Sequence, residues 1–128
     1  MNKVVLITGG ARGIGSAIAL ELAKHGYDIV INYLTSKQPA KELKEKIESQ
    51  YHVHCLTICA DVSDVDQVNI MVSEIEEKMG GVDILINNAA VDLSNLFHLK
   101  NAEEFKRTLD VNVVGAFNCS KRVYKHML

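Results

Sequence analysis

The sequence predicts an α/β fold of three layers, in which helices cover both faces of a parallel β-sheet. Two observations predict it. Short apolar runs typical of buried strands alternate with longer segments of helical spacing along all 128 residues, without a linker or low-complexity tract. A glycine-rich stretch also joins the first such run to the first helical segment. Strands that alternate with helices of this length form right-handed βαβ crossovers, so one domain over residues 1–128 is expected.

The glycine-rich stretch is Thr8-Gly9-Gly10-Ala11-Arg12-Gly13-Ile14-Gly15, between a predicted strand at 3–7 and a predicted helix at 14–24. Glycines let the backbone turn tightly and let a ligand approach without a Cβ in the way. Free N–H groups and the positive end of the helix dipole then favour a phosphate. Glycines also gather at sharp turns for purely structural reasons, so this stretch alone leaves both interpretations open.

The other elements are predicted in chain order. A strand at 28–33 precedes a helix with Pro39 in its first turn, which runs to about residue 50. A strand at 53–58 leads to a helix capped by Ser63 and ended by Gly80-Gly81. A strand at 82–86, a polar loop and a long helix that begins with a capping box of Asn101 and Glu104 complete the chain. The expected apolar stripes are Ala17, Ile18 and Leu22 on the first helix, and Phe105, Leu109, Val113, Ala116, Ser120, Val123 and Met127 on the last.

Composition narrows the class of protein. Hydrophobic content of 48% with 23% charged residues is typical of a globular domain, and a net charge of −2 gives no electrostatic case for nucleic acid or an anionic membrane surface. No apolar run approaches the ~18 residues of a membrane span, and no signal peptide precedes the first strand, so the cytoplasm is the expected location. Cys55, Cys59 and Cys119 form no metal-like cluster. Cys55 and Cys59 fall on one face of a predicted strand and are expected to be buried free thiols in a reducing compartment.

Three motifs follow predicted strands and a fourth lies on the last helix. They are Thr8-Gly9-x-x-x-Gly13-Ile14-Gly15, Asp61-Val62, Asn87-Asn88-Ala89-Ala90 and Asp110-Val111-Asn112-Val113-Val114-Gly115. In order and spacing they resemble the first half of a classical short-chain dehydrogenase/reductase, most similar to the 3-oxoacyl-(acyl carrier protein) reductase branch. The resemblance implies a Rossmann-like three-layer fold with strand order 3-2-1-4, truncated relative to the family fold. The motifs depart from the family at Ala90, where the family has glycine.

The resemblance also implies a cofactor site, which open parallel sheets place beyond the carboxyl ends of their strands. In the family the residues after the third strand hold the adenine, and those after the fourth strand lie close to the ribose. The methyl group of Ala90 is therefore expected to weaken cofactor binding without abolishing it. Asn112 is the catalytic residue that the resemblance places in this chain. The implied cofactor-binding residues are Thr8, Gly9, Gly10, Arg12, Gly13, Ile14, Gly15, Asn32, Tyr33, Leu34, Ser36, Asp61, Val62, Asn88, Ala89, Ala90 and Val111.

The segment after the second strand bears on the choice between NADP(H) and NAD(H). Sites that prefer NAD place an Asp or Glu there to bind the ribose hydroxyls, whereas this chain has Tyr33 and no carboxylate near it that would repel a 2′-phosphate. Arg12 could reach such a phosphate, as the equivalent basic residue does in NADP-dependent relatives, and Lys37 is a second candidate. The alternative for Arg12 is an exposed, solvated side chain. The sequence favours NADP(H) over NAD(H).

Family chemistry further requires a Ser and a Tyr-x-x-x-Lys pair, which belong to elements beyond the Asn112 helix. Tyr33 and Lys37 have that spacing but lie at the adenosine end of the expected site. The first hypothesis is therefore the cofactor half of an NADP-dependent reductase of 3-oxoacyl thioesters or similar carbonyls. The substrate would be a small molecule or would be linked to an acyl carrier. The second is a non-catalytic nucleotide-binding or self-associating module. A homo-oligomer is expected, because the fourth strand would keep an open apolar edge.

Overall fold

The computed structural model describes residues 2–90, 97–99 and 101–128, and its centre is a four-stranded parallel sheet of order β3-β2-β1-β4. The strands are β1 (Val4–Ile7), β2 (Asp28–Tyr33), β3 (Cys55–Cys59) and β4 (Ile84–Ile86). In register, Val5 lies opposite Ile29 of β2 and Ile84 of β4. The predicted fold class and strand order are confirmed. The polar loop expected after Ala90 falls largely outside the described residues.

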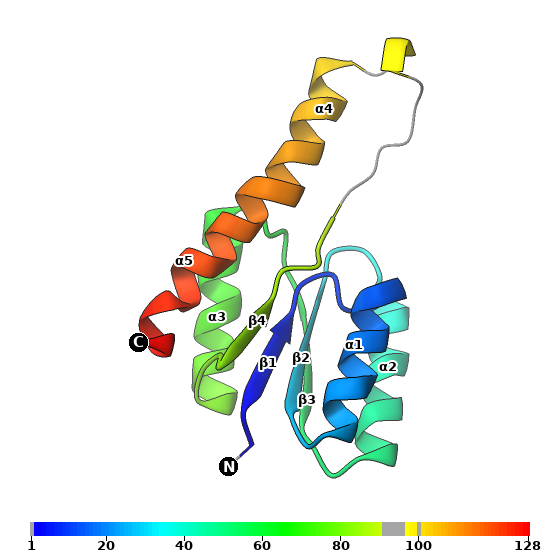
Figure 1. Ribbon diagram of the computed structural model, residues 1–128, viewed down its shortest axis with the longest axis vertical. Helices are drawn as coiled ribbons and strands as arrows, with labels where there is room; N and C mark the ends of the chain where they lie inside the picture. Colours follow the sequence, from blue (N-terminus) through cyan, green and yellow to red (C-terminus); the bar gives the residue numbers. More distant parts are fainter. Residues whose placement is uncertain (1, 91–96, 100) are drawn as a thin grey trace.

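Helices cover both faces of this sheet (Figure 1). The helices α1 (Gly13–Lys24) and α2 (Lys37–Gln50) pack on one face, and α3 (Val65–Met79) and α5 (Gly115–Met127) pack on the other. Successive residues of a strand point to opposite faces, so both sides of β1 are buried. Val5 and Ile7 join the cluster beneath α1 and α2, whereas Val4 and Leu6 join the cluster beneath α3 and α5.

The structure bears on three features predicted for the first three helices. Gly26 and Gly80 have φ of +91° and +88°, which confirms that they end helices in the left-handed conformation. The prediction of Ser63 as a cap is wrong: Asp64 caps α3 by accepting the N–H groups of residues 66 and 67. Ala17 is exposed, contrary to prediction, because α1 faces the sheet with the small residues Gly15, Ala19 and Ala23.

The last predicted helix consists of three segments. Asn101 caps α4 (Ala102–Leu109) by accepting the N–H of Glu104 at 2.8 Å, as predicted. A π-helical stretch, η2 (Asp110–Val114), joins α4 to α5. A short 3₁₀ turn, η1 (Phe97–Leu99), precedes them.

The prediction of an apolar stripe on this helix is wrong. Most of its members are exposed, including Phe105 at 57% and Val113 at 60%, and α4 buries none of its residues. The helix α5 instead faces the body of the protein with Gly115, Asn118, Cys119 and Val123. Two of these four do not appear in a search for apolar periodicity, because one has no side chain and the other is polar.

The contacts of Gly115 and Asn118 explain this orientation. A Cβ on Gly115 would lie 2.5 Å from Val62 Cγ2, so only glycine lets α5 approach the loop after β3 so closely. Asn118 Nδ2 donates a hydrogen bond to the carbonyl of Val62 at 2.9 Å. The position of α5 is therefore set by close contact with this loop rather than by an apolar stripe.

Burial at the two edge strands differs from the sequence-based expectation in one respect. Cys59 is exposed although Cys55 and Cys119 are buried, because Cys59 lies at the carboxyl end of the edge strand β3. At the other edge, β4 pairs only with β1 among the described residues, and its Ile84 and Ile86 are half-buried. The expected open edge at the fourth strand is therefore present in the described part of the chain.

Candidate functional site

The turns that follow the four strands enclose a cavity of about 240 Å³ at the carboxyl-end edge of the sheet. Nine of the residues predicted to bind a cofactor line it. Thr35 and Ala60 also line it and were not predicted, although each directly adjoins a predicted residue. The lining residues are Gly9, Asn32, Leu34, Thr35, Ser36, Ala60, Asp61, Val62, Ala89, Ala90 and Val111.

The glycine turn between β1 and α1 packs tightly against the segment after β4. Gly9 has φ of +61°, and a Cβ at this position would lie 2.9 Å from the Cα of Ala89. A Cβ on Gly15 would lie 2.6 Å from Asn88 Nδ2 and 2.7 Å from the carbonyl oxygen of Gly9. Gly9 and Gly15 are thus required by close contact within the protein, and the family motif has a packing role before any ligand is considered.

Thr8 and Asn88 fasten the ends of β1 and β4 together. The Thr8 hydroxyl oxygen accepts the N–H groups of Asn88 and Ala89, both at 3.0 Å, and the hydroxyl donates to the Ile86 carbonyl at 3.4 Å. Asn88 Nδ2 donates to the Gly9 carbonyl at 3.0 Å. Neither Thr8 nor Asn88 lines the cavity. Their hydrogen bonds instead hold the backbone of Gly9 and Ala89, which do line it.

Asn32 connects the carboxyl ends of three strands. Its Oδ1 accepts the N–H of Gly9 at 3.2 Å, and its Nδ2 donates to the Ala60 carbonyl at 3.1 Å. Its backbone carbonyl accepts the N–H of Gly10 at 3.0 Å. Asn32 is buried, and these bonds hold the glycine turn over β2 and β3. Its amide is therefore engaged within the protein although the residue borders the cavity.

The opposite wall of the cavity carries a charged network. Asp61 Oδ1 accepts the backbone N–H of Ser63 at 3.0 Å and its hydroxyl at 2.7 Å, and Oδ2 accepts Arg107 Nη2 at 3.2 Å. Partial burial acts to raise the pKa of Asp61, but the hydrogen bonds from Ser63 and the charge of Arg107 outweigh it and lower this pKa. Sequence reasoning missed Arg107, because no local motif links it to a partner 46 positions away.

Several predicted residues lie outside the cavity lining. Arg12, Gly13 and Ile14 are exposed where α1 begins. Tyr33 is partly buried against the core cluster beneath α1 and α2. Asn112 lies exposed on η2, directly after Val111, which is buried and lines the cavity. The π-helical stretch therefore carries Asn112 next to the cavity wall.

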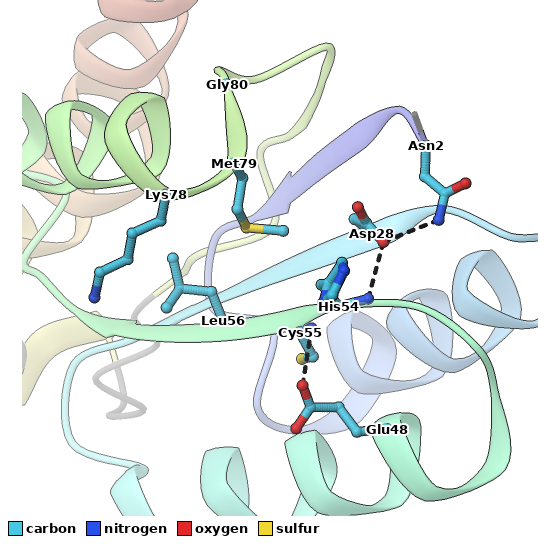
Figure 2. A pocket seen from close by; sticks show the side chains of 9 residues that line it. All are labelled: Asn2, Asp28, Glu48, His54, Cys55, Leu56, Lys78, Met79 and Gly80. Atoms are coloured by element: carbon cyan, nitrogen blue, oxygen red, sulfur yellow. Dashed lines mark hydrogen bonds between the residues drawn. The ribbon is translucent and has the colours of Figure 1, made fainter.

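A second cavity, of about 590 Å³, is lined in part by residues at the start of β2 and β3 (Figure 2). None of the predicted site residues lines it. Several of its polar groups form hydrogen bonds within the protein. Asp28 Oδ1 accepts Asn2 Nδ2 at 3.1 Å and the N–H of His54 at 2.9 Å, and Glu48 accepts the N–H of Cys55 at 3.4 Å. Burial and, next, the charge of Glu48 raise the pKa of Cys55 to about 12, so this thiol stays protonated and is a poor nucleophile.

Two features are absent from the described part of the chain. It contains no group of three or more His, Cys, Asp or Glu side chains that could hold a metal ion. None of its helices combines the length and apolar character needed to cross a membrane.

The sheet order, the glycine turn and the cavity beyond the strand ends together define a Rossmann-like α/β protein. Residues 3–128 match the short chain dehydrogenase family, and the chain belongs to this family. It is 40% identical to a 3-oxoacyl-(acyl-carrier-protein) reductase of Staphylococcus epidermidis, covering 100% of this chain and 52% of the relative. It is 39% identical to versicolorin reductase 1 of Dothistroma septosporum, covering 98% of this chain and 48% of the relative.

A solved structure shows the same relationship. A short-chain dehydrogenase from Burkholderia cenocepacia J2315, in complex with NADP, is 35% identical with a TM-score of 0.90, over 96% of this chain and 50% of that chain. The chain thus spans about half the length of the curated relatives that it matches.

Proposed function

We propose that this chain binds NADP(H), in preference to NAD(H), and forms the cofactor-binding half of an NADP-dependent carbonyl reductase. The observation that carries the proposal is the cavity in which the glycine turn meets Asp61 and the segment after β4. Such a cavity, beyond the carboxyl ends of parallel strands, is where open α/β sheets bind dinucleotides. The bound cofactor would supply the hydride for reduction of a carbonyl group.

The glycine turn would bind the pyrophosphate. A helix N-terminus presents free N–H groups and partial positive charge, and α1 begins directly after this turn. Gly13, with φ of +54° and no atom within 4 Å of an added Cβ, keeps the approach open. Exposed Ile14 would cover part of the cofactor with an apolar side chain.

The 2′-phosphate of NADP(H) would lie near the residues that follow β2. Leu34, Thr35 and Ser36 line the cavity there, and none is acidic. The helix α2 begins at Lys37, so its positive N-terminus and the Lys37 side chain both favour an anion. Arg12 is exposed and would supply the cation closest in sequence to the glycine turn.

Asn112 would be the catalytic residue of this chain, because its motif matches that of the family's catalytic asparagine. The proposed substrate is a 3-oxoacyl thioester, presented on a small molecule or an acyl carrier. The likeness to 3-oxoacyl-(acyl-carrier-protein) reductase, at 40% identity over the whole chain, supports this substrate class.

Calorimetric titration of the chain with NADPH and, separately, NADH tests the proposed cofactor. We expect NADPH to bind more tightly by about tenfold, the effect of one charge-assisted contact. Arg12→Gln should reduce this ratio, whereas Lys24→Gln, a charge change at the other end of α1, should leave it unchanged. Equal affinities, or tighter binding of NADH, would contradict the cofactor assignment, and no binding of either would contradict the proposed function.

A second candidate function is a self-associating module without reductase activity. One side of β4 is unpaired among the described residues, and α4 and α5 expose Phe105, Leu109, Phe117 and Tyr124. An open strand edge and an apolar helix face both favour association with another chain. We expect the 128-residue chain to form homo-oligomers in analytical sedimentation, and a monomer at high concentration would contradict this expectation.

A further inference from the structure

Arg107 connects α4 to the loop between β3 and α3. Its Nη2 donates to Asp61 Oδ2 at 3.2 Å, and its Nη1 donates to Ser63 Oγ at 2.9 Å. The Ser63 hydroxyl in turn donates to Asp61 Oδ1 at 2.7 Å. The helix α4 buries none of its residues, and this polar contact joins it to the loop. Arg107 itself does not line the cavity, whereas Asp61 does.

The carboxylate of Asp61 retains room for one more hydrogen-bond donor. An ionised carboxylate offers about four acceptor positions and no donor. The N–H and hydroxyl of Ser63 occupy two of them on Oδ1, and Arg107 occupies one on Oδ2. The side chain of Asp61 is 21% exposed and borders the cavity, so the remaining position is open to a ligand.

This arrangement distinguishes between purine bases. The amino group of adenine donates a hydrogen bond, and the one remaining acceptor position of Asp61 matches such a donor. A base with a carbonyl oxygen at the same place, such as hypoxanthine, would bring this oxygen next to the Asp61 carboxylate. Both groups are hydrogen-bond acceptors, so no hydrogen bond could form between them. An unpaired, partly desolvated carboxylate costs free energy, so the second base is disfavoured.

We infer that Arg107 is a positioning residue of the cofactor site, which makes the site selective for adenine by fixing the orientation of the Asp61 carboxylate. The inference rests on the proposed function, since it requires that a dinucleotide binds in this cavity. Arg107 acts through Asp61 and Ser63 and does not contact the ligand. Without the guanidinium, Ser63 still holds Oδ1 of Asp61, but Oδ2 loses its fixed donor and gains an open acceptor position. The preference for a base with a single amino group then weakens.

The test compares NADP⁺ with its deamino analogue, in which hypoxanthine replaces adenine, by calorimetric titration of the wild-type chain and of Arg107→Met. We expect the wild-type chain to prefer NADP⁺ by about tenfold and Arg107→Met by no more than about threefold, consistent with the loss of one charge-assisted bond. Arg107→Lys, which keeps the charge but not the paired geometry, should lie between them.

Arg122→Met is the matched control. Arg122 joins α5 to α3 through Glu76 at 2.7 Å, which is also a partly exposed ion pair between two elements, and it does not line the cavity. This variant should keep the wild-type ratio of affinities. If Arg107→Met also keeps that ratio, or weakens both ligands equally, Arg107 is a structural residue only and the inference is wrong.

Two further outcomes separate this inference from the proposed function. If circular dichroism shows that Arg107→Met does not fold, Ser63→Ala replaces it. This variant removes only the Ser63 hydroxyl, which donates a hydrogen bond to Asp61 and accepts one from Arg107. We then expect the preference to fall by about threefold, and an unchanged ratio contradicts the inference. A wild-type chain that binds neither dinucleotide overturns the proposed function, and the inference with it.

Discussion

The two walls of the small cavity are built from different interactions. The wall formed by the glycine turn and the segment after β4 is neutral and tightly packed: Thr8, Asn32 and Asn88 hold backbone groups, and the space beside Gly15 cannot take a methyl group. The opposite wall is charged and partly exposed, since Asp61 is held by Ser63 and Arg107. We expect the first wall to determine the shape of the proposed cofactor site, and the second to determine which ligand groups that site accepts.

The largest expected effect lies in the packed wall, at Gly15. Gly15→Ala would place a Cβ 2.6 Å from Asn88 Nδ2 and break the bond from Asn88 to Gly9. We expect a loss of about 1–3 kcal/mol in the free energy of unfolding and at least about a hundredfold loss of NADPH affinity. Urea unfolding and calorimetric titration measure the two quantities. Normal affinity in this variant would show that the packed wall does not set the shape of the site.

Ala17→Gly is the control for that substitution. Ala17 lies on the exposed face of the same helix, so its replacement costs about 1 kcal/mol in helix stability without touching the cavity. NADPH affinity should therefore remain near the wild-type value.

The second effect concerns Asn32, which joins the packed wall to β3. Asn32→Leu keeps the volume but leaves the N–H of Gly9 and the carbonyl of Ala60 without their partner. An unsatisfied buried group costs about 1–3 kcal/mol, so a large fall in the urea midpoint is expected. The same change at exposed Asn69 on α3 should alter the midpoint little, and equal effects at both positions would contradict the role given to Asn32.

The charged wall should respond to pH in a way that the packed wall does not. Because the pKa of Asp61 is lowered in the folded protein, the ionised side chain stabilises the fold above its ordinary pKa of 3.8. This contribution is lost as the pH falls through the lowered folded value. The stability difference between wild type and Asp61→Asn should thus be constant near neutral pH and shrink in acid. Thermal unfolding across this range measures it, and a difference independent of pH would contradict the assignment.

The smallest expected effect is at Ala90, where the chain departs from the family motif. Ala90 is exposed and lines the cavity, so Ala90→Gly removes one methyl group from the wall. We expect NADPH to bind about threefold more tightly, because the backbone can then approach the cofactor more closely. Weaker binding in the titration would mean that the methyl group does not hinder the cofactor.

The comparison of the walls also shows what the sequence could predict. The strands and the glycine turn follow from apolar runs and glycine positions, which are local patterns, whereas the strand order follows from the resemblance to the family. The network of Asp61, Ser63 and Arg107 is a contact between distant segments, so no local pattern indicates it. Ser63 was predicted to cap α3, but its side chain belongs to this network.

The last helix shows the same limit in a different form. Apolar spacing predicts a continuous stripe, but the structure inserts a π-helical stretch at Asp110–Val114 and buries Gly115 and Asn118. These two residues face Val62 because of close backbone approach and a hydrogen bond, neither of which a hydrophobic pattern records. Tertiary contact therefore decided the orientation of this helix.

The most direct test of the site is to map NADP⁺ binding on the backbone amides of this chain by nuclear magnetic resonance. We predict shift changes at Gly9, Gly13 and Gly15, at residues 34–36 and at Asp61. The larger cavity, which contains His54 and Leu56, serves as an internal reference and should show none. Changes centred on His54 and Leu56, or no changes with saturating NADP⁺, would contradict the assignment of the cofactor site to the carboxyl-end edge of the sheet.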